Sequence, residues 1–81
     1  MSIAKIHIET KFRKFEDGEV IALFPTEAWN RFDETITSYM HIGQHGGAHP
    51  DLIEELEVAT AEEYKALETE LNNIGYQVEV V

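Results

Sequence analysis

Hydrophobic and polar residues alternate along three segments of the chain, and this period of two is typical of half-buried β-strands. In the first segment the inward positions are predicted to be Ile6, Ile8, Thr10 and Phe12. The opposite face is largely basic and is expected to meet solvent; it carries His7, Glu9, Lys11 and Arg13. The same alternation predicts a strand over residues 35–42, with Ile36, Ser38, Met40 and Ile42 on one face, and a last strand over residues 76–80.

Turn residues separate the first two strands, and the second strand differs from the others in pattern. The Asp-Gly pair at residues 17–18 predicts a hairpin turn, because glycine adopts the positive φ that such turns require. Residues 20–24 are apolar at every position, which predicts a central strand that Pro25 ends. Residues 26–34 allow two interpretations: a short helical turn capped by Thr26, or a loop held by Trp29 and Phe32.

The clearest helix signal is a capping box at residues 60–63, in which the side chains of Thr60 and Glu63 satisfy free backbone amides. An apolar stripe follows at spacings of three and four: Tyr64, Leu67, Leu71 and Ile74. Gly75 is predicted to end this helix, and a shorter helical turn is expected after Pro50. The pattern predicts one α+β domain over residues 1–81. It has a mainly antiparallel sheet of about four strands in the order β-β-β-α-β, with one amphipathic helix packed on it.

Acidic residues dominate the chain: sixteen Asp and Glu face six Lys and Arg, for a net charge of −10. The imbalance lies after residue 14, because residues 15–81 hold fifteen acidic residues against only Arg31 and Lys65. Such a field repels nucleic acids and anionic membranes and attracts basic protein surfaces. Carboxylates also raise solubility, so the charge alone leaves a purely solvating role open. Because the negative charge repels both, direct contact with nucleic acid or membrane is not expected.

The composition removes several functional classes. The absence of cysteine excludes disulfide scaffolds, thiol nucleophiles and cysteine zinc sites, and it fits a reducing cytoplasm. No apolar run approaches the ~18 residues that cross a bilayer, and the N-terminus shows no signal-peptide core. The two serines lie in no nucleophile motif, and there is no phosphate-binding glycine loop. A cytoplasmic protein with no cofactor and no enzymatic activity is therefore expected.

Three of the four histidines fall within residues 41–49, HIGQHGGAH, which Pro50 follows. A spacing of four would align them on a helix, but two adjacent glycines cost a helix interior about 2 kcal/mol relative to alanine. A structured loop is therefore the favoured interpretation, and such a loop can present Gln44 and His45 to a partner. Alternatively the loop folds around zinc, for which the candidate ligands are His41, His45, His49 and Asp51.

Three segments carry a resemblance to known proteins: FRKFEDGEVIALFP (12–25), SYMHIGQHGGA (38–48) and VATAEEYKALETELNNIGY (58–76). In the motifs DGxVIALFP and SYxHxGQHG, the chain resembles a family of small uncharacterised bacterial proteins. Members of that family are carried on plasmids, conjugative elements and phages. The resemblance implies a bacterial cytoplasm and an origin on a mobile element, and it implies no catalytic residue.

Our leading hypothesis is a non-enzymatic interaction protein that binds a basic surface of a host protein. A host defence complex that holds DNA or RNA fits such a role, as for an anti-CRISPR or anti-restriction protein, because carboxylates can imitate a phosphate backbone. The candidate partner-binding residues are Glu54, Glu55, Glu57, Glu62, Glu63, Glu70, Gln44 and His45.

Two alternatives stay open. The first is a metal- or small-ligand-binding module centred on residues 41–49. The second is a homodimer, in place of a monomer, in which the first or last strand lies at a sheet edge and pairs with a second copy while Trp29 and Phe32 are buried.

Overall fold

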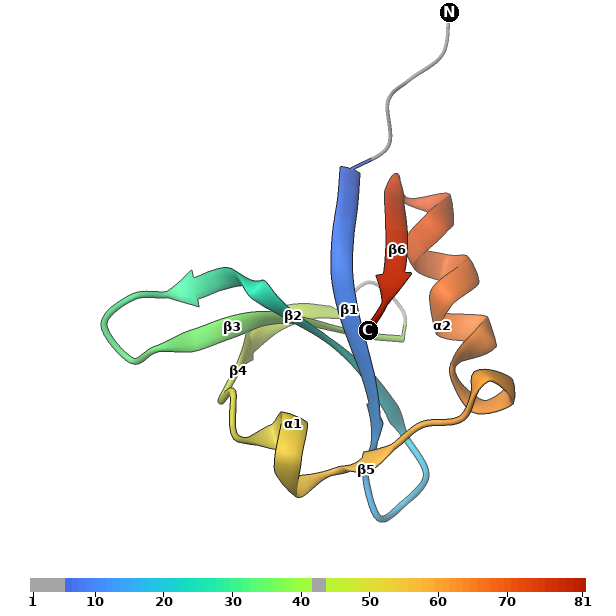
Figure 1. Ribbon diagram of the computed structural model, residues 1–81, viewed down its shortest axis with the longest axis horizontal. Helices are drawn as coiled ribbons and strands as arrows, with labels where there is room; N and C mark the ends of the chain where they lie inside the picture. The colour runs from blue at the N-terminus through green and yellow to red at the C-terminus, as the bar shows by residue number, and fades with distance from the viewer. Residues whose placement is uncertain (1–5, 42–43) are drawn as a thin grey trace, which may run out of the picture.

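The strands of the protein form one sheet, and the longer helix lies alongside it (Figure 1). The computed structural model describes residues 6–41 and 44–81; there, six strands follow the order β4-β3-β2-β1-β5, with β6 beside β1. The strands are β1 Ile6–Lys14, β2 Val20–Asn30, β3 Thr35–Met40, β4 Gln44–Ala48, β5 Glu57–Val58 and β6 Tyr76–Val80. The helices are α1 Leu52–Glu55 and α2 Ala61–Asn73. The α+β class with one main helix is confirmed, but the sheet has six strands and not four.

β1 has two different partners along one of its edges. Residues 6–10 pair with β6 in parallel, from Ile6 against Tyr76 to Thr10 against Val80. Arg13 and Lys14 pair antiparallel with β5, while β2 pairs along the other edge. Because α2 joins β5 to β6, it runs back along the sheet between these two short strands (Figure 1). The first strand therefore has neighbours on both sides only at Arg13 and Lys14, while residues 6–10 pair with β6 alone. The last strand, β6, pairs only with β1 among the described strands, so it lies at a sheet edge as one of the two suggestions had it.

α2 begins and ends where the sequence predicts. The Thr60 hydroxyl accepts a hydrogen bond from the Glu63 amide at 3.3 Å, and the Glu63 carboxylate accepts one from the Thr60 amide at 2.9 Å. Gly75 follows the helix with a φ of 115°. Of the predicted stripe, Leu67 and Leu71 are buried and Tyr64 is half-buried, but Ile74 is 52 % exposed, because it lies one residue beyond the helix. Within the described part of the chain, neither helix has the length and apolar character needed to cross a bilayer.

Apolar side chains are buried on both faces of the sheet. The α2 face holds Ile8, Phe12, Ala22, Phe24, Tyr39, Ala59, Leu67 and Leu71. The other face holds Ile21, Leu23, Ile36 and Ala48, against which Leu52 and Ile53 of α1 pack. The fully apolar run in β2 therefore reflects a central strand covered on both sides, as predicted.

Arg13 was expected on a solvent-facing side of β1, and this expectation is wrong. Its side chain is only 9 % exposed, because α1 covers this part of the sheet. Arg13 Nε donates to the Ile53 carbonyl at 2.7 Å, and Nη1 donates to the Phe12 carbonyl at 3.0 Å. The arginine therefore ties α1 to β1.

β2 continues past Pro25, contrary to prediction. The pairing with β3 shifts register between Phe24 and Ala28, so the proline lies at an irregularity where its missing N–H does not interrupt a regular ladder. Residues 26–30 form exposed strand and residues 31–34 form the turn to β3. Of the two interpretations of residues 26–34, the helical turn is therefore wrong, and a loop is found only at residues 31–34. The turn is built on side-chain acceptors: Asn30 Oδ1 accepts from the Phe32 amide at 2.8 Å. Phe32 itself is fully exposed at 101 %.

β4 occupies the stretch for which a loop was predicted. Its residues pair antiparallel with β3, from Gln44 against Met40 to Ala48 against Ile36. The Trp29 indole lies against Gly47, where a Cβ would lie only 3.0 Å from the indole Cγ and Nε1. Glycine is therefore used at residue 47 to admit an aromatic ring, and local sequence rules misread it as a loop signal. Ile42, predicted to extend the third strand, lies outside the described residues.

Candidate functional site

The fold brings carboxylates from four separate segments to one end of the molecule, where the β1–β2 turn and β5 lie between α1 and the first turn of α2 (Figure 1). We call this surface the acidic end. Shared hollows and the ion pairs of Lys14 connect Glu16, Asp17, Glu19, Glu55, Glu57 and Glu63. We include Glu54 and Glu62, which precede Glu55 and Glu63 directly in the chain. Five of these glutamates were among the residues predicted from the sequence to bind a partner.

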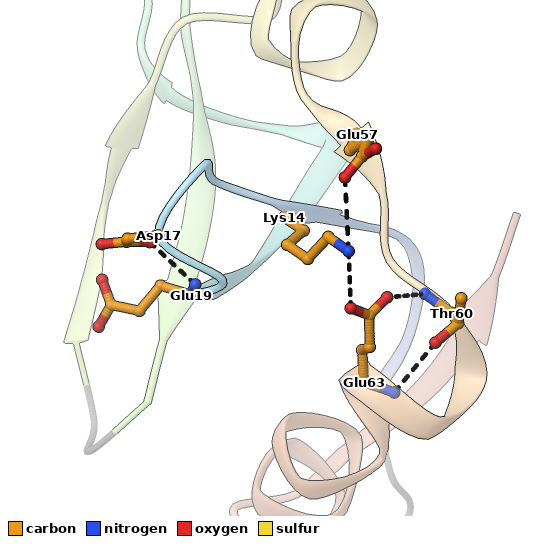
Figure 2. Close-up of polar contacts among 6 residues, drawn as sticks. All are labelled: Lys14, Asp17, Glu19, Glu57, Thr60 and Glu63. Atoms are coloured by element: carbon orange, nitrogen blue, oxygen red, sulfur yellow. Dashed lines mark hydrogen bonds and ion pairs between the residues drawn. The ribbon is translucent and has the colours of Figure 1, made fainter.

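Lys14 links β1, β5 and α2 at the centre of the acidic end (Figure 2). Its Nζ donates to Glu63 Oε2 at 2.7 Å and lies 3.4 Å from Glu57 Oε2. The hydrogen bond from Lys14, followed by those from Thr60, lowers the pKa of Glu63 from 4.5 to about 2. The hydrogen bond to Glu63 in turn raises the pKa of Lys14. Glu57 and Glu63 are thus partly neutralised within the chain.

The remaining carboxylates of the acidic end have no such partner. In the part of the chain that the structure describes, Lys14 is the only Lys or Arg that forms an ion pair with this surface. Glu54, Glu55 and Glu62 are exposed, and so is Glu16 on the β1–β2 turn. These side chains are free to meet a cation from outside.

Sequence reasoning missed the acidic residues of the β1–β2 turn. The turn forms as the Asp-Gly pair predicts: Gly18 has a φ of 91°, and Asp17 Oδ1 accepts from the Glu19 amide at 2.9 Å (Figure 2). It brings Glu16 and Glu19 close to the end of α1, about forty residues further along the chain. These acidic residues could have been placed beside α1 only by predicting that β1 pairs with β5. β5 has only two residues, which are too few for a strand pattern to be recognised in the sequence.

An apolar hollow lies beside this turn. Phe15, Met40 and Leu56 line it together with Glu16, Asp17 and Glu19, and its volume is about 600 Å³. All three apolar side chains are only partly buried, and they pack against the core cluster on the α1 face. The acidic end therefore combines carboxylates with a patch of apolar surface.

Glu70, one of the candidate partner-binding residues, is already engaged within the chain. Its carboxylate accepts a hydrogen bond from the Tyr39 hydroxyl at 2.7 Å and lies 2.8 Å from His41 Nδ1. Tyr39 is itself buried under α2 and only 1 % exposed. Glu70 therefore joins α2 to the end of β3 and is not a free carboxylate.

The histidines of residues 41–49 are each held by a different neighbour. His41 lies against Glu70, His45 Nε2 lies 3.3 Å from the Tyr76 hydroxyl, and His49 Nδ1 accepts from the Asp51 amide at 3.2 Å. Among residues 6–41 and 44–81, no three His, Asp or Glu side chains come together as a metal-binding group. His45 is exposed at the surface of β4, while the side chain of Gln44 lies outside the described part. Residues 44–48 of this stretch form a strand, and a turn follows at residues 50–51.

The fold and the site define a small acidic α+β protein whose most distinctive surface is suited to cationic groups. Comparison of the chain with protein-family models, curated proteins and solved structures gives no match. The resemblance to the mobile-element family therefore stays a prediction from the quoted sequence words.

Proposed function

We propose that this protein binds a basic surface of another protein through its acidic end, and that it acts by occupying that surface. One observation carries the proposal: carboxylates from four segments converge, and within the described residues a single lysine forms ion pairs with them. Like charges held close together repel one another, so a cationic partner removes an electrostatic cost that the folded chain otherwise bears. Complementary potentials of this kind speed association and select the partner.

The proposed partner class is a host protein that otherwise holds nucleic acid. Exposed carboxylates spaced over turns and helix ends can take the places of phosphates in an arginine-rich groove. The mobile-element origin implied by the sequence resemblance makes host defence complexes the proposed targets, in an anti-CRISPR or anti-restriction role. Bound there, the protein competes with DNA or RNA and needs no chemistry of its own.

A pair of charge-matched variants tests the proposal. Glu54→Gln, Glu55→Gln and Glu62→Gln neutralise three exposed carboxylates of the acidic end, and Glu9→Gln, Glu27→Gln and Glu34→Gln neutralise three exposed ones elsewhere. Both triple variants carry the same net charge. The immobilised protein is incubated with host lysate at low ionic strength, and retained proteins are identified by mass spectrometry.

We expect a basic, nucleic-acid-binding host protein to be retained by the native chain and by the control variant, but not by the acidic-end variant. Retention should weaken as the ionic strength rises from about 0.05 to about 0.3 M, because exposed charges are screened over that range. Equal loss in both variants would mean that only net charge matters, and the proposal would be abandoned. Retention of no basic protein at low salt would have the same consequence.

A further inference from the structure

The hollow beside the β1–β2 turn shares lining residues with two others. One, of about 410 Å³, reaches β4 and α1 and is lined in part by Gly46, His49 and Leu52. The other, also of about 410 Å³, reaches Glu55 and Glu57. Phe15 lines all three hollows, so they adjoin one another, and we call them together the groove.

The floor and the rim of this groove differ in chemistry. Phe15, Met40 and Leu56 make an apolar floor, whereas Glu16, Glu19 and Glu55 stand along the rim. None of these three glutamates forms an ion pair with a Lys or Arg of the described residues. The one lysine that lines the groove, Lys14, is already bonded to Glu57 and Glu63. Within the described residues, no Lys or Arg neutralises the rim carboxylates, and no apolar side chain has been found to cover Phe15, Met40 and Leu56 where they line the hollow.

We infer that this groove binds a segment of the partner protein in which a lysine or arginine stands next to an apolar side chain. The inference rests on the proposed function and names the place where the partner docks. A long cationic side chain lays its aliphatic stem on apolar surface and keeps its charged head among polar groups. The apolar neighbour covers the floor, and the charged head reaches the rim carboxylates.

A second copy of the chain is the competing occupant. The exposed tip of the β2–β3 hairpin offers the same chemistry, with Arg31 next to the fully exposed Phe32. Two chains of net charge −10 repel each other, however, whereas a basic partner is attracted. Charge complementarity therefore favours a segment from a different protein.

The test uses the full chain labelled with ¹⁵N and the blocked peptide acetyl-Leu-Arg-Phe-Arg-amide, followed by amide chemical shifts. Two further peptides serve as probes: one with citrulline for both arginines, and one with serine for leucine and phenylalanine. The site variant is Glu16→Gln with Glu19→Gln, and the matched control is Glu9→Gln with Glu27→Gln. All four positions are exposed, so unfolding midpoints measured by circular dichroism should stay at the native value.

We expect saturable shifts at residues 15–19, at Met40 and at residues 55–57. The site variant and the citrulline peptide should each raise the dissociation constant by about fivefold, since two exposed ion pairs are weakened. The control variant should change it by less than about twofold, and the serine peptide should lose the shift at Met40. Shifts confined to other surfaces, or equal binding of the citrulline peptide, would overturn the inference.

Shifts at the same amides that depend on protein concentration without peptide, and that vanish in Phe32→Ser, would assign the groove to a second copy and also overturn it. Glu16 and Glu19 are untouched in the variant that tests the proposed function. Absence of saturable peptide binding by the native chain, with lysate capture retained, therefore refutes this inference alone. Loss of capture in the acidic-end variant but not in the control supports the proposed function, whatever the peptide result.

Discussion

The polar contacts of Arg13 are the ones whose loss should lower the free energy of unfolding the most. Its guanidinium is almost buried and donates to the carbonyls of Ile53 and Phe12 at 2.7 and 3.0 Å. Arg13→Met keeps an unbranched apolar stem but leaves both carbonyls without this donor. A hydrogen bond from a charged donor contributes about 1.5–3 kcal/mol, and part of that sum is offset because the cation no longer has to be desolvated. We expect the free energy of unfolding to fall by about 2–3 kcal/mol.

The measurement is urea unfolding followed by circular dichroism, together with a thermal midpoint. For a domain of this length the expected loss corresponds to a midpoint lowered by at least about 10 °C. Arg13→Lys should lose about half as much, because a single ammonium can reach one of the two carbonyls. Arg31→Met is the matched control, since Arg31 is exposed, and it should stay within about 0.5 kcal/mol of the native chain. If Arg13→Met were as stable as the native chain, this expectation would be refuted. The free energy needed to bury the guanidinium would then equal the free energy that its two hydrogen bonds contribute.

Three further outcomes follow from the contacts described above. The pKa of Glu63 is lowered to about 2, so the stability that its carboxylate contributes is complete above about pH 4.5 and is lost as the pH falls towards 2. Thermal midpoints should therefore fall less steeply with acid in Glu63→Gln than in the native chain, and parallel curves would contradict the lowered pKa of Glu63. Thr60→Ala should lower the free energy of unfolding by about 1 kcal/mol, because the helix loses its cap; no change in urea unfolding would argue against the capping box. Gly47→Ala should lower it by about 1–2 kcal/mol and raise the solvent exposure of Trp29, seen as red-shifted fluorescence. In a Trp29→Ala background the same change should be neutral, and a cost that persists there would place the conflict elsewhere.

Elements that depend on neighbouring residues were predicted correctly. The capping box, the Asp-Gly turn and the short helical turn after Pro50 all form, because each is specified within four or five residues. One local signal failed, since β2 continues past Pro25 through a shift of register. The other errors concern contacts between distant segments. β4 pairs with β3 and places Gly47 against the Trp29 indole, and Arg13 is buried because α1 lies over it. Neither contact leaves a periodic trace in the sequence.

The candidate site was predicted in part, for the same reason. The glutamates of residues 54–63 follow one another along the chain and could be recognised as a cluster from the sequence alone. Glu16 and Glu19 join them only because β1 ends where β5 begins to pair with it. Glu70, which looks equivalent on a helical wheel, is instead held by Tyr39 and His41. Helical periodicity predicts which side of a helix a residue occupies, but it does not predict which side chains of other elements the residue contacts.

The parallel pairing of residues 6–10 with residues 76–80 has a consequence for synthesis on the ribosome. β1 is made before β6, so half of one edge of β1 stays open until β6 has left the exit tunnel. An open edge is a template on which neighbouring nascent chains can pair, and closure over so long a stretch of chain is slow. Chains with an excess of carboxylates repel one another, so the net charge opposes such pairing while the sheet is still incomplete.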